Sequence, residues 1–407
     1  MTHVVFIAPL FREATVRFVR AFLELGDARV STVGQDPIEA LEPSLRARLN
    51  GHVRVSDSLD PDLLTAGVRE VIRLHGRVDR VVGHLEQLQI PLGLVRDRLG
   101  LDGMGEAVAR NFREKNRMKE ILGAAGVPVA RHRLCSSDAE LRAFADQLGW
   151  PIIVKPPDGL GAKATYRLTT AEELDAFLRL HPPRPGDPVQ AEEFLDIAEE
   201  NTCETVSIAG RVVWRSGTRY LPPVLEVVEN PWMQYCVVLP RETDDPRARS
   251  IVDPNEATLR ALGQTTGLTH LEWFKRRDGR VVVNEVGARP PGAGIMPLMS
   301  HAHEFDAWRA WAGLMTHDRF EPPTRRWATG AAFFRGVGAG RVAEVSGLAE
   351  AHAEMGDLVV ERSLPKVGQP KSASYEGEGW AIVRHAETAV VIEALHRLVS
   401  LIRIAYA

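Results

Sequence analysis

The segment that most constrains the fold is residues 270–285, HLEWFKRRDGRVVVNE, in which two β-rich runs flank Asp278-Gly279. An Asp-Gly pair supplies the positive φ angles that a tight hairpin turn requires, so the segment is predicted to form an antiparallel hairpin. With these two residues as the loop, the register places Glu272 directly opposite Glu285. A four-residue loop gives the same pairing.

Two carboxylates that face each other across a hairpin repel and destabilise the sheet unless a positive charge lies between them. A hard cation with oxygen ligands is the natural candidate for that charge. Two other interpretations stay open. Both glutamates are solvated on an open face of a sheet, or a three-residue loop shifts the register and separates them.

A chain of 407 residues is too long for one ordinary core, so two or three domains are expected. With a net charge of −4, the chain has no general attraction for nucleic acid or anionic membranes. Its cysteines, Cys135, Cys203 and Cys236, are odd in number and far apart, which fits neither a disulfide framework nor a zinc site. No apolar run has the length of a signal or membrane-spanning segment, so we expect a cytoplasmic protein.

The N-terminal part alternates strand-like and helical patterns. The pattern predicts strands at residues 4–8, 30–33 and 78–82, and helices at 12–25 and 63–74. Such alternation favours a small parallel α/β domain, which we place at residues 1–108. The first strand is not followed by G-x-G-x-x-G, so a dinucleotide-binding domain is not predicted.

A second segment contains a strand at residues 152–155 that ends in Lys155. It precedes a glycine-rich turn at residues 158–165, whose backbone N–H groups can close over a polyphosphate. The turn does not match the Walker A pattern. Taken singly, Lys155 and Lys115 are as well explained by solvated surface lysines, which is where lysine usually occurs.

A second hairpin is predicted across Ala209-Gly210, and its register places Glu204 opposite Arg215. Glu204 then either forms a cross-strand ion pair or contributes to a substrate site, and the sequence does not decide between them. Beyond residue 324 the pattern predicts a further group of strands and one amphipathic helix, at residues 331–335, 358–361, 381–384 and 386–402.

Taken in order, four motifs resemble the ATP-grasp superfamily, and in particular its carboxylate-amine ligases: Arg113-Glu114-Lys115-Asn116, Ile152-Ile153-Val154-Lys155-Pro156, Glu192-Glu193-Phe194-Leu195, and Glu285-Val286-Gly287-Ala288-Arg289 with Glu272 upstream. The resemblance covers about residues 110–320. It implies a fold of the α/β and α+β classes, with an ATP-grasp domain at residues 109–320. The α/β domain at 1–108 would precede it, and a small α+β C-terminal subdomain at 321–407 would cover the active site or form a homodimer contact.

The resemblance also implies how ATP would be held. Lys115 and Lys155 correspond to the lysines that hold the α- and β-phosphates. The loop at residues 158–165, which includes Gly159 and Gly161, corresponds to the loop that closes over the γ-phosphate.

The resemblance also implies which residues would bind the adenine and the ribose. Glu192, Phe194 and Leu195 correspond to the hinge that meets the adenine edge. Glu200 corresponds to the acidic residue that binds the ribose hydroxyls.

Glu272 and Glu285 correspond to the pair that binds Mg²⁺ or Mn²⁺, and Arg289 together with Lys155 to the catalytic cations. The family commonly has Asn where this chain has Gly287, so the sequence leaves open whether one or two metal ions bind. One ligand of a second metal ion would then be missing, or supplied by Asn284 or water.

The function implied is an ATP-dependent ligase that activates a carboxylate as an acyl-phosphate and joins it to an amine, releasing ADP and phosphate. Its partners would be small-molecule acids and amines, among them amino acids or other small metabolites, with no nucleic acid and no membrane. Biotin-carboxylase-like carboxyphosphate chemistry and a nucleotide-binding module without turnover are the alternatives. The sequence does not identify the acid or the amine.

Overall fold

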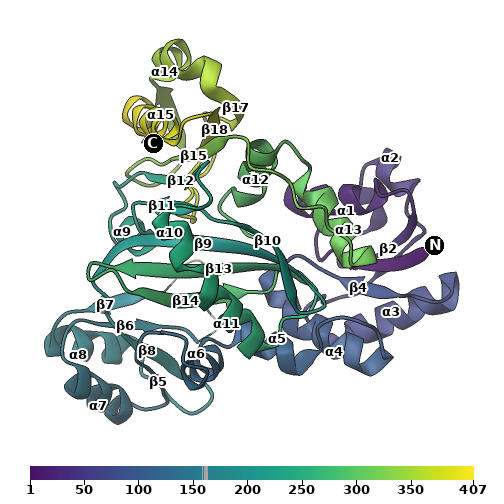
Figure 1. The fold of residues 1–407 in the computed structure, drawn as a ribbon, viewed down its shortest axis with the longest axis horizontal. Coiled ribbons are helices and arrows are strands. Elements are labelled where there is room, and N and C mark those ends of the chain that lie inside the picture. The colour runs from purple at the N-terminus through teal and green to yellow at the C-terminus, as the bar shows by residue number, and fades with distance from the viewer. Residues whose placement is uncertain (158, 160–163) are drawn as a thin grey trace.

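The chain, as a computed structural model, is described for residues 1–157, 159 and 164–407. It begins with a parallel sheet of strand order β3-β2-β1-β4, flanked by helices (Figure 1). The predicted strands and both predicted helices of this region are confirmed. The elements are β1 (Thr2–Ile7), α1 (Glu13–Leu23), β2 (Ala28–Gly34), α2 (Pro43–Arg46), β3 (Gly51–Arg54), α3 (Pro61–His75), β4 (Arg80–Val82), α4 (Gln89–Leu99) and α5 (Glu106–Arg113).

A small antiparallel sheet of order β5-β8-β6-β7 follows. The helices that cover it begin where the sequence supplies a cap, since Ser137 and Thr170 accept hydrogen bonds from backbone N–H groups of the first turns. The elements are α6 (Lys115–Ala124), β5 (His132–Cys135), α7 (Asp138–Leu148), β6 (Ile152–Lys155), β7 (Tyr166–Leu168), α8 (Ala171–Leu180) and β8 (Val189–Glu193).

A long sheet of order β14-β13-β9-β11-β12-β15-β18-β17 spans the rest of the molecule, with β10 paired to β9 (Figure 1). Its first two strands, β14 and β13, are the central hairpin, and they lie beside the small antiparallel sheet (Figure 1). The elements are β9 (Ile197–Ile208), β10 (Arg211–Ser216), β11 (Arg219–Leu221), α9 (Val224–Glu229), β12 (Tyr235–Leu239), α10 (Pro246–Ser250), α11 (Val252–Leu262), β13 (Gly267–Arg276), β14 (Val281–Gly287), α12 (Ile295–His303) and α13 (Ala307–His317).

The three strands and the helix predicted beyond residue 324 are confirmed, and the strands extend the same long sheet rather than forming one of their own. A separate apolar cluster packs α15 against β15 and β18. The elements are β15 (Ala328–Phe334), β16 (Val342–Ser346), α14 (Leu348–Met355), β17 (Val359–Ser363), β18 (Gly379–His385), α15 (Thr388–Leu401) and β19 (Arg403–Tyr406). No helix in the described part of the chain is long and apolar enough to span a membrane.

The turn of the central hairpin differs from the prediction. The backbone N–H of Gly279 donates to the carbonyl of Arg276, and the N–H of Arg276 donates to the carbonyl of Arg280, both at 2.9 Å. The loop therefore has three residues, 277–279, instead of two. Gly279 takes a φ of +84°, which the last position of such a loop requires and which glycine adopts without strain.

A three-residue loop shifts the register by one residue, yet Glu272 still pairs with Glu285. A β-bulge restores the register because Asn284 is an extra residue, without a partner opposite it in β13. The predicted pairing of the two glutamates is thus confirmed, whereas the loop length from which it was argued is wrong. The loop and the bulge offset each other.

The second hairpin also contains a bulge, at Val213, and here it overturns the prediction. Glu204 faces Ser216 instead of Arg215, because the extra residue moves Arg215 one position along β10. Arg215 forms an ion pair with Glu256 on α11. The predicted cross-strand pair of Glu204 and Arg215 is therefore wrong, and the buried Glu204 has a different partner, described below.

Candidate functional site

A cavity of about 230 Å³ lies between the small antiparallel sheet and the first strands of the long sheet. Its walls include every predicted site residue that the structure describes: Lys115, Lys155, Gly159, Glu192, Phe194, Leu195, Glu200, Glu272, Glu285 and Arg289. Gly161 lies outside the described residues. Side chains separated by up to 174 positions in sequence therefore share one cavity, whereas their roles in it remain predictions.

Part of the cavity wall is apolar and is called the apolar slot here. The short segment that follows β8, with Phe194 and Leu195, forms its edge. The guanidinium group of Arg167 lies 5.5 Å from the centre of the Phe194 ring, a cation–π contact that stabilises that ring. The other apolar groups in this region are Ala130, Ile153, Ile197 and Phe274.

Two lysines share one buried carboxylate beside this slot. The Nζ atom of Lys155 lies 3.0 Å from Oε1 of Glu192, and the Nζ atom of Lys119 lies 3.2 Å from the same oxygen. Burial alone would raise the pKa of Glu192, but the two lysines lower it to about 2. Glu192 is therefore a fixed anion that holds the Lys155 ammonium at the end of β6, where that group lines the cavity.

Lys115, the first residue of α6, bridges two walls of the cavity. Its Nζ atom lies 2.8 Å from Oε2 of Glu285 and donates to the carbonyl of Gly159 at 3.0 Å. Burial would lower the pKa of Lys115, but the charge of Glu285 raises it above its ordinary value. The lysine thus connects the glycine-rich turn to the hairpin.

The hairpin brings Glu272, Asn284 and Glu285 to the cavity wall. The bulge turns Asn284 toward Glu272, and its Nδ2 atom lies 3.4 Å from Oε2 of that residue. No cluster of three or more metal-ligating side chains occurs among the described residues. Two carboxylates nevertheless fit Mg²⁺, which commonly takes one or two protein carboxylates and completes its shell with substrate phosphates and water.

Arg289 is held by a residue that the sequence reasoning missed. Its Nε atom donates to Oε2 of Glu86, which lies just after β4 in the N-terminal parallel α/β region. A Cβ atom at residue 287 would lie 3.1 Å from the same oxygen, closer than ordinary van der Waals contact. Glycine at this position therefore leaves room for the Glu86 carboxylate beside Arg289.

His270 is a second missed residue. Its Nδ1 atom donates to Oε1 of the fully buried Glu204 at 2.8 Å, and its Nε2 atom lies 3.6 Å from Oε1 of Glu272. Burial would lower the pKa of His270, but the hydrogen bond to Glu204 and the charges of both glutamates outweigh it and raise the pKa to about 9. The imidazole is therefore a cation at neutral pH.

Glu200 is buried in β9, and Oε2 accepts a hydrogen bond from the backbone N–H of Val224 at 2.7 Å. Burial is the main cause, and the charge of Glu272 the second, of a pKa raised to about 8. In the absence of a nucleotide and metal, Glu200 is thus largely protonated at neutral pH.

The raised pKa of Glu200 makes the stability of the protein depend on pH. Between about pH 4.5 and pH 8 the folded protein retains a proton that the unfolded chain releases, so the Glu200 carboxyl makes the free energy of unfolding fall as pH rises. Glu200→Gln removes the titrating group and keeps an oxygen for the Val224 N–H. We expect the nucleotide-free variant to melt at a higher temperature than the wild type at about pH 8.5, with a smaller difference at about pH 5.

The control is Glu199→Gln, which makes the same substitution in the same strand. Glu199 is partly exposed, and its carboxylate lies 4.0 Å from the cation of Arg219. Thermal unfolding followed by circular dichroism at both pH values measures the effect. A Glu200→Gln variant whose melting temperature changes with pH as the wild type's does would show that Glu200 does not carry the shift.

The missed residues differ in how well the sequence marks them. His270 and Glu272 are two residues apart in a predicted strand and so share a face, and Lys119 lies one helical turn after Lys115. Either relation pointed to the residue. Glu86 has no such signal, because it lies 203 positions from Arg289 in sequence.

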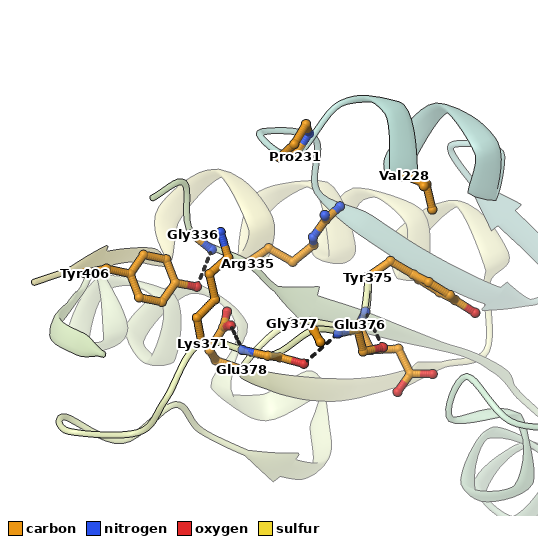
Figure 2. A pocket seen from close by; sticks show the side chains of 13 residues that line it. Val228, Pro231, Arg335, Gly336, Lys371, Tyr375, Glu376, Gly377, Glu378 and Tyr406 are labelled. Atoms are coloured by element: carbon orange, nitrogen blue, oxygen red, sulfur yellow. Dashed lines mark hydrogen bonds between the residues drawn. The ribbon is translucent and has the colours of Figure 1, made fainter. Parts of the chain in front are cut away.

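A second cavity, of about 400 Å³, lies beside the segment 371–378 in the C-terminal region (Figure 2). Tyr375 lines both cavities. The charged groups of the second cavity have protein partners: Arg335 donates to the carbonyl of Met233 at 2.9 Å, Glu378 accepts from the N–H of Ser372 at 2.8 Å, and Lys371 donates to a backbone carbonyl.

Comparison with known proteins gives three findings. A model of the ATP-grasp domain matches residues 120–305. The chain is 27% identical to the L-arginine-specific L-amino acid ligase of Bacillus subtilis over 263 residues, which cover 63% of this chain and 62% of that protein. It is 26% identical to the alanine–anticapsin ligase of Bacillus subtilis over 251 residues, or 56% of this chain and 52% of that protein. The match thus spans less than two thirds of either relative.

The crystal structure of the L-amino acid ligase from Bacillus licheniformis has the same fold. It superposes with a TM-score of 0.80 at 19% identity, over 100% of this chain and 99% of the other. The predicted fold class is therefore confirmed over the whole chain. At this identity the likeness concerns the fold alone, and the positions of the domain boundaries stay predictions.

Proposed function

The chain belongs to the ATP-grasp superfamily, and from this premise we propose that it is an ATP-dependent ligase that activates a carboxylate as an acyl-phosphate and joins it to an amine. The observation that carries the proposal is the convergence of Lys115, Lys155, the facing pair Glu272 and Glu285, and Arg289 on one cavity. Cations and carboxylates in this arrangement suit the β- and γ-phosphates of ATP together with a divalent ion.

In this proposal the apolar slot at Phe194 and Leu195 takes the adenine, and Glu200 takes the ribose hydroxyls. Lys155 and Lys115 neutralise the phosphate oxygens. Glu272 and Glu285 hold Mg²⁺ or Mn²⁺, which when bound supplies further charge neutralisation at the phosphates.

The reaction has two steps. A carboxylate oxygen of the acid attacks the γ-phosphorus, the bond between that phosphorus and the β–γ bridging oxygen breaks, and ADP leaves. The amine nitrogen then attacks the acyl carbon, loses a proton and displaces phosphate. Arg289, a planar fork of donors fixed by Glu86, is suited to the negative charge that grows on the acyl oxygen in the second step.

The names of the two curated relatives support amino acids as substrates, at least on one side of the new bond. Both are ligases of amino acids by those names. We therefore propose an amino acid as the acid, the amine or both, in keeping with the small-molecule partners expected from the sequence.

The proposal is tested by incubating the protein with ATP, Mg²⁺ and pairs of amino acids, and by using a carboxyl group labelled with ¹⁸O for any active pair. We expect ADP and phosphate as products, with ¹⁸O from the acid in the phosphate. This label transfer occurs only if the γ-phosphoryl group passes through the carboxylate.

Three outcomes would contradict the proposal. Stoichiometric AMP and pyrophosphate would show that the acid is adenylated. Turnover that requires bicarbonate and no amino acid would favour the carboxyphosphate alternative. Binding of ATP without turnover for any acid and amine would favour a nucleotide-binding module.

A further inference from the structure

Three side chains form a connected line from the protein core to the cavity. Glu204 on β9 is fully buried, His270 on β13 bonds to it at 2.8 Å, and Glu272 follows at 3.6 Å from the other ring nitrogen. Only Glu272 of the three was predicted to act at the site. The order is thus carboxylate, imidazole, carboxylate, with one carboxylate in the core and the other at the cavity wall.

The strand register produces this line. His270 pairs with Glu204 on β9 and with Gly287 on β14, so its cross-strand neighbours are a glutamate on one side and a glycine on the other. Glu272 is two residues further along β13 and on the same face. A space of about 10 Å³, roughly the volume one water molecule needs, lies beside Gly287, and His270 is among its walls.

The contact between His270 and Glu272 is not needed to neutralise Glu204. Arg325 is a second cation near the Glu204 carboxylate, and it donates to Oγ of Ser216, the residue opposite Glu204 across β9 and β10. The core carboxylate therefore has Arg325 near it in addition to its hydrogen bond with His270. The second nitrogen of His270 is left for Glu272.

We propose that His270 is a positioning residue that holds the Glu272 carboxylate in the orientation in which it takes the metal ion, with Glu204 fixing the ring. The inference rests on the proposed function, because it assigns a metal to Glu272. Groups that orient a metal ligand in this way commonly change metal affinity about 10- to 100-fold when they are removed. Across the hairpin, Lys115 at 2.8 Å holds Glu285 as His270 is proposed to hold Glu272.

The test is the binding of Mn²⁺ in the presence of ADP, followed by the electron paramagnetic resonance signal of free Mn²⁺. It compares the full-length wild type with His270→Gln and Glu204→Gln, and thermal unfolding without metal is measured in parallel. We expect both variants to raise the Kd for Mn²⁺ about 10- to 100-fold. If one variant does not fold, the other decides the question, because both interrupt the same line of contacts.

The matched control is Asn255→Ala. Asn255 on α11 is fully buried and donates to Oγ1 of Thr205, the residue after Glu204, so its loss disturbs the same strand without reaching Glu272. We expect this variant to melt at a lower temperature and to bind Mn²⁺ as the wild type does. Wild-type Mn²⁺ affinity in His270→Gln or in a folded Glu204→Gln would overturn the inference.

The inference and the proposed function can fail separately. Wild-type protein that binds Mn²⁺ with ADP but releases no ADP from ATP would defeat the ligase and leave the positioning role to the binding data. Normal ligase activity together with unchanged Mn²⁺ affinity in both variants would defeat the positioning role alone.

Discussion

Glu285→Gln is expected to lower the rate of ATP turnover by about 10³-fold or more, because a neutral amide replaces a carboxylate at the point where the phosphates and the metal would meet. The substitution preserves the size of the side chain. It removes the anion that lies 2.8 Å from Lys115, so we also expect a modest loss of thermal stability. The rate of ADP release with the best acid and amine pair, and the melting temperature, are the two measurements.

The physical reason for this stability loss is visible in the pKa of Glu285. Burial would raise it, but Lys115 and Lys155 lower it to about 2, so the carboxylate is charged and compensated in the folded protein. Lysine thus supplies positive charge beside Glu285 even without a metal ion. Removing Glu285 leaves Lys115 without that partner.

Glu226→Gln is the matched control for Glu285→Gln. Glu226 lines the same cavity, is exposed and belongs to α9, away from the hairpin. The same loss of charge there should change turnover less than tenfold. Equal losses in the two variants would mean that turnover depends on the total charge of the cavity, and the metal assignment of Glu285 would be wrong.

Lys155→Met is the second substitution with a large expected effect. We expect kcat/KM for ATP to fall about 100-fold, because the lost ammonium would face a polyphosphate in a partly enclosed site where charges are poorly screened. Lys155 lines the cavity, and among the described residues its carboxylate partner is the buried Glu192, at 3.0 Å. Isothermal titration with ADP and steady-state kinetics would separate the loss of binding from the loss of rate.

Lys119→Met is a close control because it also removes a lysine cation that pairs with the Glu192 carboxylate. Lys119 lies 3.2 Å from Glu192 but is not among the residues that line the cavity. Burial is the main cause of its pKa being lowered to about 8, with repulsion from Lys155 adding to the effect. We expect Lys119→Met to lower the melting temperature and to retain most of the ATP affinity. The opposite order of the two affinities would contradict the placement of Lys155 at the phosphates.

Patterns that are local in sequence predicted local structure well. Periodicity over ten to twenty residues predicts the alternating strands and helices of residues 1–82, the strand that ends at Lys155 and the amphipathic helix near the C-terminus. Tertiary contacts did not override these patterns. The hairpin register at Glu272 is right although the loop was counted wrongly. A three-residue turn and a bulge at Asn284 cancel, and no turn rule fixes where a bulge will occur.

The second hairpin shows the limit of the same reasoning. Its turn at Ala209-Gly210 was predicted correctly, but the bulge at Val213 shifts every pair beyond it by one position. The partner of Glu204 is then found on β13 instead of β10, because β9 pairs with strands on both sides. The register of one hairpin gives no information about a third strand that pairs with it.

The sequence by itself determined which lysines and carboxylates are candidates to hold phosphates and a hard cation, because lysines at strand and helix ends and facing carboxylates occur in short motifs. Only the tertiary structure decided how those groups are held. Glu86 reaches Arg289 across 203 positions of the chain, and it does so where Gly287 lacks a side chain. Such contacts depend on how separately folded parts pack together, and side-chain periodicity within one element carries no information about a partner in another.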